Sequence, residues 1–129
     1  MSVTIKLKYL RHSPRKLRAT TRLFNGKNLT WAINQTSVMP QDSAEYLRKA
    51  LLMAQAAAVQ KEYNPETLEI KAIQANDGPK IKRMRPTARG RSSKYIKHLA
   101  HLIVTVDVEA EKPTKPAKKI SKTNEDKKD

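Results

Sequence analysis

Residues 78–91 read GPKIKRMRPTARGR, and this stretch decides the fold. Its centre, residues 86–90, is the part of the chain richest in turn-forming residues. On either side, residues 67–72 and 102–108 alternate apolar with polar or less buried positions, which is the period of a half-buried strand. If these strands pair antiparallel with Ile70 opposite Val106, the turn falls midway, at residue 88. The sequence therefore predicts a long β-hairpin.

The two arms of this hairpin lose their apolar alternation between about residues 76 and 100, so they cannot pack on a core. About twelve residues per arm, at ~3.3 Å each, give a projection of roughly 40 Å. Residues 79–98 hold eight Lys and Arg residues and no Asp or Glu. Because an isolated two-stranded ribbon is unstable in water, we expect the hairpin to lie against an anionic surface.

Outward from the hairpin, the N-terminal region predicts a strand and a helix. Apolar side chains alternate with polar ones from residue 3 to Tyr9, as in a half-buried strand. Ser13 followed by Pro14 is typical of a helix start, and we expect that helix to run to about Phe24. The Asn-Gly pair that follows favours a left-handed C-terminal cap at Gly26.

The middle of the chain predicts two further helices. A short one is expected around residues 29–35. A longer one begins near Asp42, whose spacing to Glu45 is that of a capping box, and runs to about Tyr63. Its apolar residues recur every three or four positions, and Asn-Pro at 64–65 stops it. This is the expected central helix.

The expected fold class is therefore α+β: a small three-stranded antiparallel sheet packed on about three helices, with a long projecting β-hairpin. We expect one domain over residues 1–109, with the hairpin extension at about 76–100. Residues 110–129 are rich in Lys, Pro and acids and predict a disordered basic C-terminal tail.

The charge is large and unevenly distributed. The 129 residues include 27 Lys and Arg against 12 Asp and Glu, a formal net charge of +15. Residues 1–40 and 79–98 each carry eight basic residues and no acid, and the region between them is close to neutral. Solubility alone does not require such segregation. It indicates a polyanionic partner, with nucleic acid favoured over an anionic membrane.

Several function classes are disfavoured. The chain has no cysteine, which excludes disulfides, Cys-ligated zinc and a thiol nucleophile. The most apolar stretch, residues 50–59, is too short to span a bilayer, and no secretory signal follows the N-terminus. We expect a soluble, cytoplasmic protein with no membrane partner.

The sequence also contains few of the residue patterns that are typical of catalytic sites. The three glycines are isolated, so no phosphate-binding loop is indicated. His98 and His101 would point to opposite faces of a strand and cannot chelate one metal. His12 lies beside Ser13 without a placed acid. We expect no catalytic residue, no metal, no cofactor and no small-molecule substrate.

The stretch from Gly78 to Arg91 resembles the hairpin of the universal large-subunit ribosomal protein twenty-two family, in its bacterial type. The likeness continues without a gap to residues 101–106. Upstream, residues 13–18 (SPRKLR) are similar to the family's first-helix motif, and Gly26 with Lys27 is similar to its closing pair. The resemblance covers about residues 3–108. Thr87 departs from it, because a basic residue usually follows that proline.

The resemblance implies a structural protein of the large ribosomal subunit that binds large-subunit ribosomal RNA, supports subunit assembly and lines the polypeptide exit tunnel with its hairpin tip. The implied partners are that RNA, neighbouring ribosomal proteins and the nascent polypeptide near the tip, on a cytoplasmic ribosome or, alternatively, an organellar one. The RNA-binding residues it implies are Lys6, Lys8, Arg15, Lys16, Arg18, Arg22, Lys27, Lys80, Lys82, Arg83, Arg85, Arg89, Arg91, Lys94, Lys97 and His101. The implied tunnel-lining tip consists of Arg85, Pro86, Thr87, Ala88, Arg89 and Gly90.

Two alternatives remain at this point. A free architectural nucleic-acid binder could embrace a duplex with its β-arms, but such proteins commonly dimerise and insert an apolar wedge. Here the tip offers Pro86 and little else that is apolar. An RNA-modifying enzyme would need a cofactor pocket and acid–base groups that the sequence does not supply.

Overall fold

The computed structural model describes residues 2–108, and the predicted tail at 110–129 lies outside the described residues. In chain order the elements are β1 (Ser2–Leu10), α1 (Pro14–Thr21), α2 (Leu29–Val38), α3 (Asp42–Gln60), the 3-10 turn η1 (Pro65–Thr67), β2 (Leu68–Pro86), the 3-10 turn η2 (Ala88–Gly90) and β3 (Ser92–Val108).

The three strands form one antiparallel sheet in the order β1-β3-β2, so the last strand in sequence is the central one. Ile70 pairs with Val106, as the sequence predicts. Two bulges each add one residue to β2, one after Ile70 and one after Asp77. The last pair of the hairpin, Pro86 with Ser92, therefore centres on residue 89 rather than 88. The predicted fold class is confirmed.

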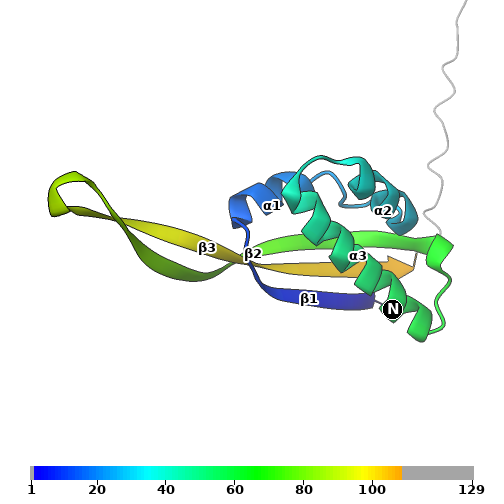
Figure 1. Cartoon of the computed structure of the whole chain (residues 1–129). Helices are drawn as coiled ribbons and strands as arrows, with labels where there is room; N and C mark the ends of the chain where they lie inside the picture. Colours follow the sequence, from blue (N-terminus) through cyan, green and yellow to red (C-terminus); the bar gives the residue numbers. More distant parts are fainter. Residues whose placement is uncertain (1, 109–129) are drawn as a thin grey trace, which may run out of the picture.

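The three helices lie on one face of the sheet (Figure 1). Alternate residues of β3, including Leu102 and Val104, are fully buried there against apolar side chains of α3 such as Leu47 and Leu51. Each fully buried leucine contributes about 1.5–3 kcal/mol relative to an exposed one. Ala54 is also buried on α3 and keeps that helix close to the sheet, because its side chain is small.

The C-terminal end of the first helix differs from expectation because the chain after it forms hydrogen bonds with the sheet. α1 ends at Thr21 rather than near Phe24, because the backbone beyond it turns toward β2. There Gly26 donates to the Ile70 carbonyl over 2.8 Å, and Asn25 accepts from the Ile73 amide over 2.9 Å. Gly26 is left-handed, with φ of +71°, as the Asn-Gly pair predicts.

The predicted capping box of α3 is wrong. Gln41, not Asp42, is the N-cap residue, and its side chain makes no capping hydrogen bond. The Gln41 side-chain oxygen instead accepts from Thr20 of α1 over 3.0 Å, and Glu45 bonds Lys49 over 2.7 Å, one turn along the helix. α3 also ends at Gln60 rather than Tyr63, and α2 extends to Val38 rather than residue 35.

The hairpin projects away from the helices as a twisted ribbon (Figure 1). The last buried side chains of its two arms are Ala75 and Ala100. Beyond them the arms are exposed, apart from half-buried residues near the root and Ile81. None of the helices within residues 2–108 is long and apolar enough to cross a membrane.

Candidate nucleic-acid interface

The pairing register sorts the side chains of the hairpin onto two faces. Directly opposed residues of an antiparallel pair share a face, and successive residues alternate. We call these the lysine face and the arginine face. The lysine face carries Lys80, Lys82, Met84, Lys94, Ile96 and His98, and the arginine face carries Ile81, Arg83, Arg85, Ser93, Tyr95 and Lys97.

The arginine face combines guanidinium groups with an aromatic ring. Arg85 lies over Tyr95, with its guanidinium carbon 5.5 Å from the ring centroid. Arginine can fork onto a phosphate and can stack on a base, whereas lysine acts as a point charge. The two faces therefore offer different chemistry to one polyanion: forked and stacking contacts on one side, point charges set among aliphatic side chains on the other.

The tip is closed by a residue that the sequence marks only as a departure from the family pattern. The Thr87 amide and its Oγ1 both donate to the Arg91 carbonyl, over 2.7 and 2.8 Å. Arg89 and Gly90 complete the bend with left-handed backbones, φ of 59° and 69°. All six predicted tip residues are exposed on this bend. Thr87 thus holds the shape that presents the flanking arginines.

The predicted cations of the body are all exposed, but they do not form one cluster. Lys6 and Lys8 alternate along β1 with residues that face the helices, so they lie on the open face of the sheet. Lys27 lies beside Ile70, whose amide donates to the Lys27 carbonyl over 2.9 Å, far along β2 from the hairpin. The α1 cations lie on the helical side.

One α1 cation has a structural partner at the root of the hairpin. Arg18 donates from Nε to the Ala75 carbonyl over 3.0 Å and forms a 2.9 Å ion pair with Asp77. Together with Arg22 it lines a shallow hollow between α1 and β2. Arg18 therefore ties the first helix to the strand at the point where that strand leaves the body.

His101, the one predicted contact that is not a lysine or arginine, is half-buried. Its Nδ1 accepts a hydrogen bond from the Tyr9 amide over 3.0 Å, and the two rings meet edge to face with centroids 5.0 Å apart. Nδ1 is therefore committed to the protein, and only Nε2 is left for an outside partner.

Tyr9 itself is a feature that sequence reasoning missed. The alternation of β1 places it among the inward-facing residues, but it is 64% exposed and its φ is +58°. A bulge between Leu7 and Leu10 turns it out. A strained, exposed aromatic residue at a sheet edge is a candidate for stacking with a base. The exposure of Tyr9 follows only from the pairing register of β1 with β3, which the sequence does not show.

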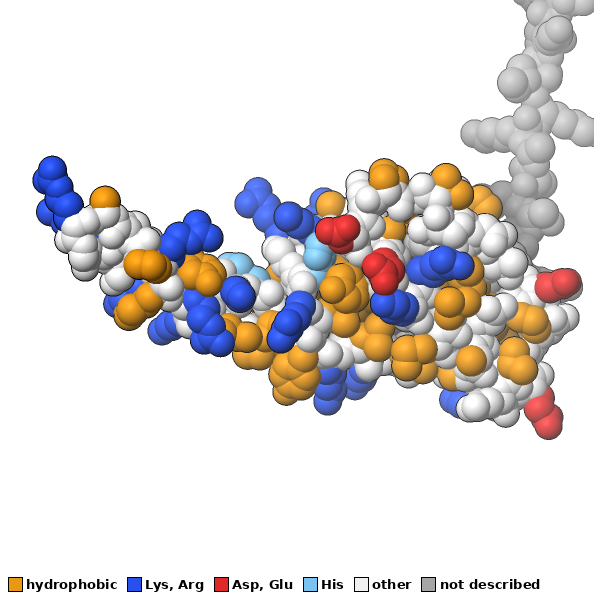
Figure 2. All heavy atoms as spheres, in the orientation of Figure 1, with side chains coloured by type: hydrophobic (Ala, Val, Ile, Leu, Met, Phe, Trp, Pro, Cys, Tyr) orange, Lys and Arg blue, Asp and Glu red, His pale blue; other side chains and the backbone are white. Residues whose placement is uncertain are grey.

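Lysine and arginine side chains gather along the hairpin and where it joins the body, whereas the acids lie on the body (Figure 2). The hairpin cations are all exposed. In the part of the chain that the structure describes, no three His, Asp or Glu side chains are placed to hold a metal ion. The hairpin is therefore a cationic surface whose charge is complementary to that of a polyanion.

Fold and surface together define a class: small basic α+β proteins that extend a cationic hairpin from a packed body. Residues 5–107 match the model of the family described as Ribosomal protein L22p/L17e. The chain belongs to this family, and it is accordingly a structural ribosomal protein and not an enzyme.

Three curated relatives illustrate the similarity, and each is named Large ribosomal subunit protein uL22. The one from Trichlorobacter lovleyi is 39% identical over 107 residues, covering 82% of this chain and 95% of the relative. The one from Syntrophobacter fumaroxidans is 36% identical over 105 residues, covering 81% and 96%. The one from Herpetosiphon aurantiacus is 35% identical over 102 residues, covering 78% and 90%.

Proposed function

We propose that this protein is a constituent of the large ribosomal subunit that binds large-subunit ribosomal RNA and supports subunit assembly. It would act in the cytoplasm as part of the ribosome, beside neighbouring ribosomal proteins. One observation carries the proposal: beyond the point where the hairpin leaves the core at Ala75 and Ala100, residues 79–98 carry eight exposed cations and no acid. Within residues 2–108, most of this ribbon packs against no apolar part of the body.

The mechanism is phosphate neutralisation combined with shape fit. The hairpin is narrow enough to lie between RNA helices, and each face meets the sugar-phosphate backbone with its own set of cations. Arg83 and Arg85 would fork onto phosphates or stack on unpaired bases, while Lys82 and Lys94 would add point charges on the other face. The body would add contacts through Lys6, Lys8 and the cations of α1.

The tip is proposed to line the polypeptide exit tunnel and to meet the nascent polypeptide. This part rests on the family resemblance of residues 78–91 and on reach. About twelve residues from Asn76 to the bend, at ~3.3 Å each, carry the tip roughly 40 Å from the body. The exposed arginines on either side of Thr87 would face the tunnel wall or its lumen.

A crosslinking map tests the proposal. A photoreactive amino acid is placed in turn at residues 80–97 of the full chain, and the crosslinked RNA is identified in intact large subunits. We expect crosslinks to several segments of large-subunit RNA along both arms, with nascent-chain crosslinks only at the tip. A protein that sediments apart from the large subunit at physiological salt would instead be a free architectural binder.

Counterion release supplies a quantitative test. If six to eight phosphates are neutralised on isolated large-subunit RNA, log K should fall with log salt by roughly 0.7–0.9 per contact. A slope equivalent to one or two contacts would contradict the electrostatic mechanism. The quadruple variant Arg83→Ala, Arg85→Ala, Arg89→Ala, Arg91→Ala should flatten the slope. Its circular dichroism should stay that of a folded body.

A further inference from the structure

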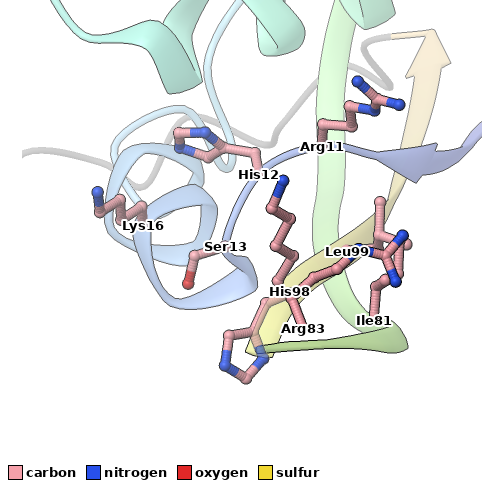
Figure 3. Close-up of a pocket in the computed structure, with 9 residues that line it drawn as sticks. Arg11, His12, Ser13, Lys16, Ile81, Arg83, His98 and Leu99 are labelled. Carbon is pink, nitrogen blue, oxygen red and sulfur yellow. The ribbon is translucent and has the colours of Figure 1, made fainter. Parts of the chain in front are cut away.

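A recess of about 500 Å³ lies at the root of the hairpin, where the two cationic blocks of the sequence meet. One side is formed by the segment that joins β1 to α1 and by the first turn of α1, and the other by the two hairpin arms (Figure 3). The residues that line it are Arg11, His12, Ser13, Lys16, Ile81, Arg83, Lys97, His98 and Leu99.

The lining of this recess supplies cations and hydrogen-bond donors without an acid. Four of the nine side chains are lysine or arginine, two from each cationic block, and Asp and Glu are absent from the lining. A hollow of the body beside α3 differs, because there Arg48 is accompanied by Asp42 and Glu45. Four like charges gathered around one recess repel one another, and a bound anion would relieve that repulsion.

The N-terminal end of α1 adds a second feature that favours an anion. Ser13 is the N-cap residue of this helix, yet its side chain makes no capping hydrogen bond. Pro14 at the first helical position has no N–H, so the Ser13 Oγ and the amides of Arg15 and Lys16, at the positive end of the helix dipole, are the groups available to an oxygen ligand. The ring of His12, which also lines the recess, packs against Tyr46 with centroids 5.6 Å apart, and its buried Nε2 has no hydrogen-bond partner within the described residues.

We propose that this recess binds the sugar-phosphate backbone of RNA, and that Arg11, Ser13 and the hairpin cations Arg83 and Lys97, which share one face of the hairpin, hold it. The inference rests on the proposed RNA-binding function and deepens it, because it adds Arg11 and Ser13 to the interface. The volume exceeds that of one phosphate group and fits a short backbone segment. Since Arg83 and Lys97 sit on the arginine face, the bound strand would continue from the recess along that face.

A consequence is that the ligand joins the body to the hairpin. Arg11 and Ser13 belong to the segment that joins β1 to α1, whereas Arg83 and Lys97 lie on the ribbon beyond the bulge between Asp77 and Lys80. A polyanion held by both pairs fixes the direction in which the hairpin leaves the body. The recess thus acts as a clamp that is completed by RNA.

The absence of cysteine makes a direct test possible. In the full chain, Ser13→Cys places a unique thiol in the recess, Ser92→Cys places one at the hairpin tip, and Ser37→Cys places one on exposed α2 as a control. The alkylation rate of each is measured free and in complex with large-subunit RNA. We expect RNA to slow alkylation at positions 13 and 92 by about tenfold or more, and at position 37 by less than about twofold.

The outcomes separate the two proposals. Protection at position 92 but not at position 13 would leave RNA binding intact and overturn the recess site. No protection at either position would overturn RNA binding itself and the recess with it. Protection at position 13 by poly-glutamate, without protection by RNA, would assign the recess to an acidic peptide and reject an RNA backbone.

A charge substitution supplies the independent readout. Arg11→Gln should weaken RNA binding about fivefold to tenfold and reduce the salt slope by about 0.7–0.9. The matched variant Arg48→Gln removes an exposed arginine from the acid-containing hollow and should change neither quantity. Equal effects of the two variants would mean that general charge, rather than the recess, accounts for the loss.

Discussion

Gly78 lies directly against the backbone of Leu99. A Cβ atom built on Gly78 would come within 2.9 Å of both the carbonyl carbon and the carbonyl oxygen of Leu99, closer than such contacts occur. This approach falls at the bulge where the pairing steps from Asp77 with Ala100 to Lys80 with His98. The two backbones thus leave no room for a side chain at the point where the free hairpin begins, and only glycine fits there.

Replacing this glycine should therefore disturb the junction. We expect Gly78→Ala to destabilise the protein by about 1–3 kcal/mol, because the new methyl group must push two backbones apart. Thermal unfolding by circular dichroism measures the loss. Gly90→Ala is the matched control, since nothing lies within 4 Å of a Cβ there and only its left-handed backbone is strained. A larger loss for Gly90→Ala than for Gly78→Ala would contradict the close-approach argument.

The ion pair with Asp77 should make the Arg18 guanidinium less available for contact with RNA. Both side chains are substantially exposed, so the pair contributes at most about 1 kcal/mol to stability. We expect Asp77→Asn to leave the unfolding midpoint nearly unchanged and to steepen the salt dependence of RNA binding by up to about one contact. Glu66→Gln, an acid removed far from the hairpin root, serves as the control. An unchanged slope in Asp77→Asn would show that Arg18 stays bound to the Ala75 carbonyl alone.

The side-chain hydrogen bond of Thr87 should stiffen the tip. Thr87→Val keeps the shape of the side chain but removes the donor to the Arg91 carbonyl. Because one such bond contributes about 0.5–1.5 kcal/mol, hydrogen exchange of the residue 87 amide should accelerate roughly twofold to tenfold. The midpoint of global unfolding should not move. Thr87→Ser, which keeps the donor, should exchange at nearly the original rate.

Core and hairpin should respond differently to the loss of apolar side chains. Leu102→Ala removes a fully buried side chain of β3 and is expected to cost about 2–5 kcal/mol. Met84→Ala removes a side chain that is 66% exposed on the hairpin and should cost less than about 0.5 kcal/mol. Denaturant unfolding of the two variants makes the comparison. Similar losses would mean that the hairpin is packed on the body after all.

Much of this fold could be predicted because its strands alternate cleanly. The pairing of Ile70 with Val106 follows from two apolar alternations and a turn-rich centre, and such a pair fixes the hairpin register as far as the next bulge. The position of the bend was one residue early, since bulges leave no mark in an alternation pattern. The capping-box expectation at Asp42 failed because α1 supplies Thr20 as a partner for Gln41, a contact between distant segments.

The candidate interface was less accessible to sequence reasoning. The cations of the hairpin are visible in composition, and their segregation needs no structure. The role of Arg18 was not visible, because its partners Ala75 and Asp77 lie almost sixty positions away. Tyr9 was assigned to the interior since only a bulge turns it out. The recess is lined by residues near position 12 and by the hairpin arms. These segments are far apart in the sequence, so no local sequence pattern indicates that they lie together.

The strand β3 runs unbroken from Ser92, beside the tip, to Val108, in the centre of the sheet. Its 17 residues, at ~3.3 Å each, form a beam roughly 55 Å long that is anchored at one end between two neighbours. Both bulges in the pairing of β2 with β3 lie in β2, so the first arm of the hairpin is the irregular one. A force applied at the tip would therefore be transmitted along β3 to the middle of the core without crossing a bulge in that strand.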